Sequence, residues 1–60
     1  MNELVKGVYD VFYEFQDDYD CGMEYVRVVA ENENHAVEKA MARQYMPYGP
    51  SEVVYRGEAQ

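Results

Sequence analysis

The stretch DVFYEFQDDYDCGMEYVRVV, residues 10–29, decides the fold of this 60-residue chain. Residues 5–15 alternate between polar and apolar with a period of two, interrupted by Val8 and Phe12, which predicts a half-buried β-strand. QDDYDCG, residues 16–22, supplies turn-forming Asp residues and a glycine, and a second strand is expected from Met23 to Glu31. The two strands together predict a β-hairpin with a loop of several residues.

After residue 31 the hydrophobic period becomes that of a helix. Asn32 is a favourable N-cap, and Glu33 suits the positive end of the helix dipole. The residues that then fall at helical spacing, and so predict one face of a helix, are Ala36, Val37, Ala40, Met41, Gln44 and Tyr45. Pro47 is expected to stop the helix, and SEVVYRG, residues 51–57, predicts a third strand.

The expected fold class is α+β in the order β-β-α-β, as a single domain over residues 1–60. A helix that returns across the sheet leaves the third strand parallel to the second, and a right-handed crossover is expected. We expect the third strand to pair with the first, which gives a three-stranded antiparallel or mixed sheet with one helix on one face.

One helix covers only one face of such a sheet. The covered face is expected to use Val11, Tyr13, Phe15, Val26, Val28 and Ala30 against Val37, Ala40 and Met41 of the helix. The open face would expose Val8, Phe12, Tyr25, Val29 and one of Val54 or Tyr55. An apolar patch of this extent is typical of an interface with a second copy or a partner protein, unless tyrosine hydroxyls keep the face hydrated.

The net charge of −7, from five Lys and Arg against twelve Asp and Glu, disfavours direct binding to nucleic acid or anionic membranes. The negative charge favours binding to a partner protein that has a basic surface, although a charge of this size also serves solubility. Between residues 10 and 24 the chain has six carboxylates and no Lys or Arg. The candidate partner-binding residues are therefore Asp10, Glu14, Asp17, Asp18, Asp20 and Glu24, with Phe12 and Tyr25 at the centre of the apolar face.

No pattern of catalytic or cofactor-binding residues is present in the sequence, so an enzyme is not expected and no cofactor or metal is predicted. Cys21 beside Asp20 is a poor candidate for a thiolate nucleophile, and His35 is read as a surface residue in the first helical turn. The residues around Asp18 do not match a calcium-binding loop. A chain this short usually needs an additional constraint, and with one cysteine we expect oligomerisation. The N-terminal residues do not resemble a signal peptide, which predicts a cytoplasmic protein.

The segment YVRVVAENENHAVEKAMARQY, residues 25–45, has a strand ending in Val28 and Ala30, a capping Asn32, and Ala36 and Ala40 four residues apart. Across about two thirds of the chain this pattern resembles the β-β-α core of small phage-encoded proteins, including some anti-CRISPR inhibitors. It is also similar to HicB-like antitoxins, whose sequences normally continue into a DNA-binding domain that is not expected within these 60 residues. The phage resemblance implies an inhibitor that occupies a surface of a host protein, by DNA mimicry in some such proteins. Asp10 and Glu14, four strand residues apart or roughly 13 Å, are compatible with two phosphate steps.

Two hypotheses follow. The first is an acidic interaction protein that docks on a basic, nucleic-acid-handling surface of a host protein. The second is a homo-oligomeric structural or accessory protein, in the simplest case a homodimer, or an antitoxin-like binding module, that uses the open face of the sheet.

Overall fold

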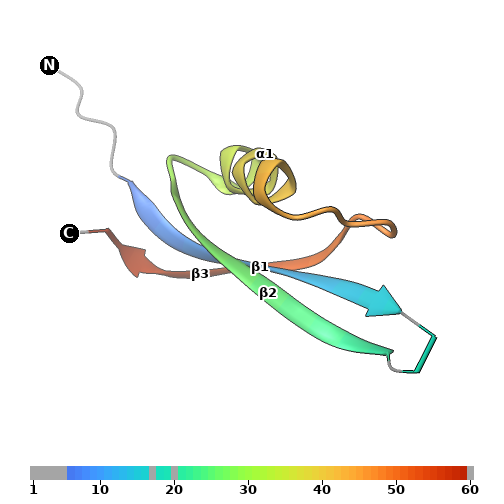
Figure 1. The fold of residues 1–60 in the computed structure, drawn as a ribbon. Coiled ribbons are helices and arrows are strands. Elements are labelled where there is room, and N and C mark those ends of the chain that lie inside the picture. The colour runs from blue at the N-terminus through green and yellow to red at the C-terminus, as the bar shows by residue number, and fades with distance from the viewer. Residues whose placement is uncertain (1–5, 17, 20, 60) are drawn as a thin grey trace, which may run out of the picture.

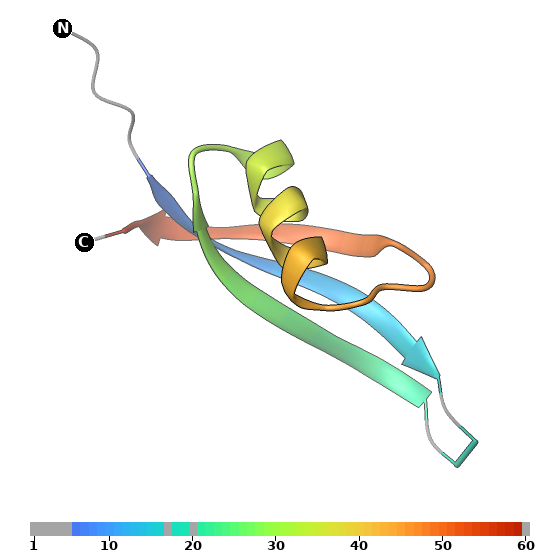
Figure 2. The same cartoon turned by 45° about the horizontal axis from the view of Figure 1, so that its top comes forward.

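The chain forms one open three-stranded sheet with a helix packed across one of its faces (Figures 1 and 2). The computed structural model describes residues 6–16, 18–19 and 21–59. Its elements are β1 (Gly7–Gln16), β2 (Cys21–Ala30), α1 (Glu33–Arg43) and β3 (Pro50–Glu58). The strand order is β2-β1-β3, and both outer strands run antiparallel to β1. The predicted α+β class and β-β-α-β order are confirmed.

The β1–β2 hairpin is regular over its whole length, from the pair Gly7–Ala30 to the pair Gln16–Cys21. The second strand therefore begins two residues before the predicted Met23. β3 pairs only with residues 7–13 of β1, and its register shifts twice, once at each end of the pairing. The last three residues of β1 and the first half of β2 consequently extend past the rest of the sheet. Val5, predicted to start the first strand, lies outside the described residues.

The helix begins as predicted and ends earlier. The side chain of Asn32 accepts a hydrogen bond of 2.8 Å from the backbone N–H of His35, which caps the first turn. The last helical residue is Arg43, because Gln44 already has an extended backbone. The prediction that the helix runs to Pro47 was wrong, and Tyr45, expected on the helical face, is 80% exposed.

The core lies between α1 and the face of the sheet that carries the odd-numbered residues of β1. It contains Tyr9, Val11, Tyr13, Val28, Ala30, Ala36, Ala40 and Met46, with Phe15, Val26 and Val53 packed partly against it. Ala36 and Ala40 are completely buried, since small side chains let the helix backbone approach the strands closely. Met41 was expected here but is 48% exposed, and Met46, just beyond the early end of the helix, is buried in this core.

The helix is also tied to the outer edge of β2. Lys39 Nζ donates a hydrogen bond to the backbone carbonyl of Val29, and Arg43 Nη1 donates one of 3.3 Å to the carbonyl of Arg27. These contacts are confined to the second half of β2. The hairpin beyond them projects past the helix (Figure 1), and residues 21–25 are all exposed.

Replacing the N-cap residue tests this account of the helix. Asn32→Ala is expected to lower the free energy of unfolding by about 1 kcal/mol, because the N–H of His35 loses its acceptor. The measurement is urea denaturation followed by circular dichroism. Asn34→Ala, two residues away inside the helix, is the matched control. It should leave stability unchanged or slightly higher, since alanine is the better helix former.

Candidate functional site

The face of the sheet opposite α1, here called the open face, carries the even-numbered residues of β1 and the odd-numbered residues of β2. Directly paired residues of neighbouring strands point to the same face. The register therefore arranges the open face in five successive rows: Val8 with Val29, Asp10 with Arg27, Phe12 with Tyr25, Glu14 with Met23, and Gln16 with Cys21. On β3, Val54 pairs with Asp10 and Glu52 with Phe12, so both join this face. Of the two candidates for the open face, Val54 is the one that lies there.

The centre of the open face is a buried carboxylate held by two arginines. Arg27 donates from Nε to Asp10 Oδ1 at 2.8 Å and from Nη2 to Oδ2 at 3.1 Å. Arg56 donates from Nε to Oδ2 at 2.8 Å. The Asp10 side chain is 2% exposed, whereas those of Arg27 and Arg56 are 59% and 48% exposed. The two guanidinium groups thus cover the carboxylate and face solvent themselves.

This arrangement corrects the expectation for Asp10, which was predicted to contact a partner. Its carboxylate is buried and shared by two arginines of the same chain, because it sits on the central strand with a cation on each neighbouring strand. The period-two pattern already placed Arg27 on the open side. Arg56 was missed, because the sequence left open whether Val54 or Tyr55 lies on the open face. With Val54 on that face, Arg56 follows two residues later on the same side.

The arginines shift the ionisation of Asp10. The hydrogen bonds from Arg27 lower the pKa of its carboxyl most, and the bond from Arg56 and the two positive charges lower it further. Burial acts in the opposite direction, and the resulting pKa is about 2. The aspartate is therefore ionised throughout the physiological range, and the cluster of three side chains has a net charge of +1.

An aromatic pair adjoins the cluster. The rings of Phe12 and Tyr25 lie with centroids 5.5 Å apart, and the guanidinium carbon of Arg27 is 5.9 Å from the centre of the Tyr25 ring. Phe12 is half-buried, and Tyr25 is 51% exposed. A continuous apolar patch was expected on the open face. The structure shows instead an aromatic and aliphatic surface that two arginines interrupt.

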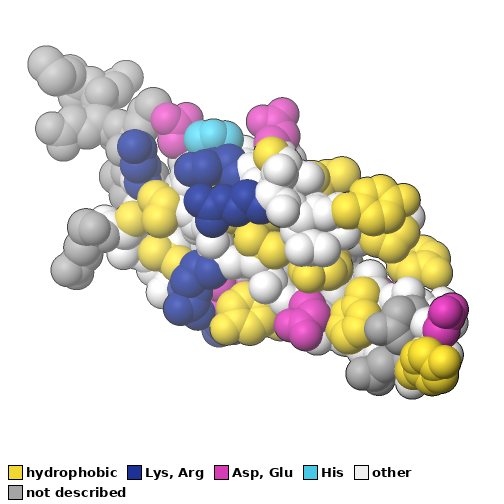
Figure 3. Space-filling view, viewed as in Figure 1, with side chains coloured by type: hydrophobic (Ala, Val, Ile, Leu, Met, Phe, Trp, Pro, Cys, Tyr) yellow, Lys and Arg dark blue, Asp and Glu magenta, His cyan; other side chains and the backbone are white. Residues whose placement is uncertain are grey.

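The other candidate residues gather at the projecting end of the hairpin. Glu14, Asp18 and Glu24 are exposed there, whereas Asp17 and Asp20 lie outside the described residues. The sequence places no Lys or Arg in residues 7–26 or 44–55, which supply the hairpin end and the neighbouring loop. Figure 3 shows the result on one side of the molecule: Lys and Arg side chains gather toward the termini, and hydrophobic and acidic side chains occupy the hairpin end. The molecule is thus polarised along its length.

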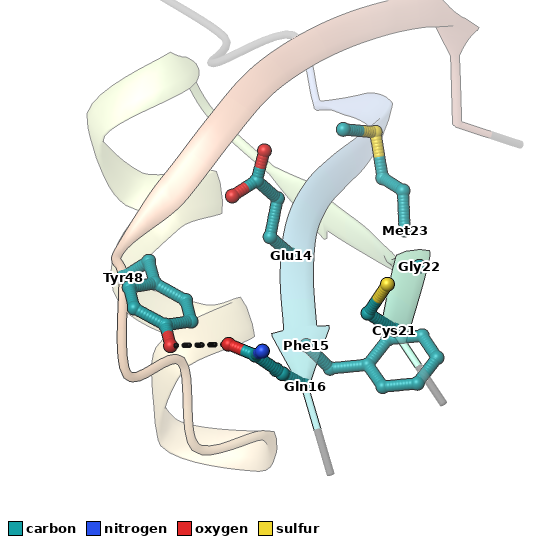
Figure 4. A pocket seen from close by; sticks show the side chains of 7 residues that line it. All are labelled: Glu14, Phe15, Gln16, Cys21, Gly22, Met23 and Tyr48. Carbon is teal, nitrogen blue, oxygen red and sulfur yellow. Dashed lines mark hydrogen bonds between the residues drawn. The ribbon is translucent and has the colours of Figure 1, made fainter. Parts of the chain in front are cut away.

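An open groove of about 580 Å³ lies beside this end, between the last residues of β1, the first residues of β2 and the loop before β3. Its lining comprises Glu14, Phe15, Gln16, Cys21, Gly22, Met23 and Tyr48 (Figure 4). Tyr48 donates a hydrogen bond of 3.2 Å to Gln16 Oε1, which links the loop to the hairpin. The groove exists because β3 ends its pairing at Tyr13 and leaves residues 14–16 of β1 without a neighbour from β3.

His35 contributes to the local structure at the helix start. Its Nδ1 accepts a hydrogen bond of 3.3 Å from the backbone N–H of Glu31. Cys21 is exposed at the first position of β2. Among the described residues, no three His, Cys, Asp or Glu side chains are grouped so that they would hold a metal ion. Within the same part of the chain, no helix has the length and apolar character needed to cross a membrane.

Comparisons with known proteins add no relative: no family model matches the chain, and no curated protein or solved structure is significantly similar to it. The resemblance to phage-encoded inhibitors and antitoxins therefore stays a prediction from the sequence pattern.

Removing the buried charge gives a pH-dependent test. The pKa of Asp10 is lowered from 3.8 to about 2, so its ion pairs stabilise the fold above pH 3.8 and lose this effect as the pH falls to 2. Asp10→Asn should lower the free energy of unfolding at pH 7 by up to about 2 kcal/mol, since the half-exposed guanidinium groups are screened by water. The penalty should largely vanish at pH 2, as measured by urea denaturation. An equal penalty at both pH values would contradict the role of the ionised carboxylate.

Proposed function

We propose that this chain is a small, non-enzymatic interaction protein whose acidic hairpin end docks on a basic, nucleic-acid-handling surface of another protein. The observation that carries the proposal is the separation of charge along the molecule. All five Lys and Arg residues lie outside the hairpin end, and Asp18 and Glu24 are exposed within it. A basic surface would attract this end and orient it during the encounter.

The shape of the molecule supports the same mode of docking. Its extents of 51 × 17 × 14 Å describe a narrow body, and the hairpin end projects beyond the helix (Figure 2). Exposed aromatic rings accompany the carboxylates there, on Tyr19 in the turn and Tyr48 in the loop before β3. Tyrosine combines apolar area with a polar hydroxyl and is frequent at protein interfaces. A narrow acidic and aromatic projection suits a groove that otherwise accepts nucleic acid.

The burial of Asp10 changes which residues make these contacts. A row of charges that begins at Asp10 and imitates successive phosphates loses its first member, because that charge is neutralised inside the sheet. Glu14 lies on the open face of the sheet, so the proposed contacts at the hairpin end are Asp18 and Glu24, together with Asp17 and Asp20, which lie outside the described residues. Inhibition of a host protein in the cytoplasm, as the phage resemblance implies, is the form of function that this docking would serve.

Charge reversal at the hairpin end tests the proposal. Asp18→Lys combined with Glu24→Lys should abolish capture of a partner from a host lysate, since both changes place cations against a basic surface. The matched control, Glu31→Lys with Glu38→Lys, has the same change in net charge at exposed positions outside the hairpin end. The control should capture the partner almost as well as the original chain.

A second readout identifies the surface of the partner. Short duplex DNA added to the captured complex should release the partner, if docking occupies a nucleic-acid-binding groove. A partner that binds the original chain, the hairpin variant and the control equally well would contradict the proposal, as would a complex that DNA leaves intact.

A further inference from the structure

The rows of the open face are complementary to themselves. The cationic cluster of Asp10, Arg27 and Arg56 lies on one side of the Phe12–Tyr25 row, and Glu14 lies one row away on the other side. The spacing between rows is two residues on both sides, roughly 7 Å. A surface with equal and opposite charges at equal distances from an aromatic row fits a second copy of the same surface.

We infer that two copies of this chain pair open face to open face, about a two-fold axis that runs across the strands over the Phe12–Tyr25 row. Such an axis reverses the strand direction and keeps the cross-strand order, so each strand faces its own counterpart. Glu14 of each copy then lies over Asp10 of the other, between the guanidinium groups of Arg27 and Arg56. The aromatic rows meet at the centre, in the manner of two aligned sheets about 10 Å apart.

The arginines are prepared for this contact. Asp10 engages the Nε atoms of both arginines and Nη2 of Arg27 and holds the two groups side by side. The guanidinium fork of each arginine has five N–H donors, so both can donate further hydrogen bonds to an added carboxylate. Glu14 is exposed on the same face. The buried Asp10 carboxylate thus holds the two guanidinium groups in position to bind the Glu14 carboxylate of the second copy.

The charge pattern also selects the direction of pairing. A two-fold axis parallel to the strands would place the cationic cluster of one copy over that of the other, with Arg27 near Arg56, which brings like charges together. The axis across the strands brings Glu14 over the cationic cluster twice, once on each side of the aromatic row. It also leaves the carboxylates of Asp18 and Glu24 at the hairpin ends out of the central rows, so this pairing stands apart from the docking proposed above.

The size of the surface sets the strength of the pairing. Five rows over β1 and β2, of which β3 extends only a part, project to roughly 400 Å² per copy at the usual strand and row spacings. The two copies together therefore bury about 800 Å², which is below the size of stable interfaces and within the range of weak, transient ones. We expect a dimer that forms reversibly at high micromolar concentrations rather than an obligate one.

One residue opposes the pairing and provides the sharpest test. Glu52 on β3 lies in the same row as Phe12, so the axis places it opposite Glu52 of the second copy. Removing that repulsion should favour the dimer, whereas removing the charge of Glu14 should weaken it. Glu14→Gln and Glu52→Gln are chemically identical changes on one face, with opposite expected effects.

Sedimentation equilibrium over a concentration series measures the dimer dissociation constant of each variant. Glu14→Gln should raise it about tenfold, and Glu52→Gln should lower it a few-fold. Circular dichroism checks that both variants keep the fold. If both changes tighten the association equally, the effect is a general loss of repulsion and the inference is wrong. A chain that stays monomeric to millimolar concentration also overturns it and leaves the open face to a different protein.

Chemical cross-linking tests the direction of the pairing. The proposed axis places Cys21 over Val29 of the other copy, whereas the two positions lie eight residues or roughly 27 Å apart on the same strand. A short bismaleimide should therefore link Val29→Cys chains into dimers through Cys21. The original chain and an Ala42→Cys control, altered on the exposed surface of the helix, should not form this product. Equal cross-linking of all three would contradict the proposed direction.

Discussion

The ion cluster of Asp10 with Arg27 and Arg56 is the interaction on which the arrangement of this sheet depends. It is the point where all three strands are joined by side chains on the face that has no helix. A carboxylate buried without partners is strongly unfavourable, so the aspartate requires both arginines in place. This ion pair ties β3 to the central strand in addition to the backbone pairing, because Arg56 lies on the same face as Asp10.

The short helix divides the molecule into two functional regions. Where α1 covers the sheet, Ala36 and Ala40 allow close packing, and Lys39 and Arg43 attach the helix to the edge of β2. Beyond the helix, the hairpin continues as a projection in which residues 21–25 are exposed, and there the carboxylates have no cations nearby in the sequence. The acidic charge is therefore concentrated where the backbone reaches furthest from the core, and the positive charge is retained where it supports the fold.

The two edges of the sheet are protected in part against pairing with other chains. The outward carbonyls of Arg27 and Val29 on β2 accept hydrogen bonds from helix side chains. On the opposite edge, β3 begins with Pro50 and carries two register shifts. Charged side chains, proline and bulges are the usual means by which edge strands avoid uncontrolled pairing. The open face, with its aromatic row and half-exposed arginines, remains the broadest surface for a specific contact.

The sequence by itself determined the hairpin, the helix start at Asn32, the strand order and the division of β1 and β2 into two faces, because these follow from period, capping and connection length. It also indicated the acidic end, since the absence of Lys and Arg around residues 10–24 is visible without coordinates. It could not place Arg56, because the pattern of residues 51–57 did not decide whether Val54 or Tyr55, and so which set of alternate residues, lies on the open face. Nor could it show that Asp10 is buried among arginines while Asp18 and Glu24 remain exposed. Carboxylates of the same type differ only in which side chains the folded sheet brings beside them, and that is decided by tertiary structure.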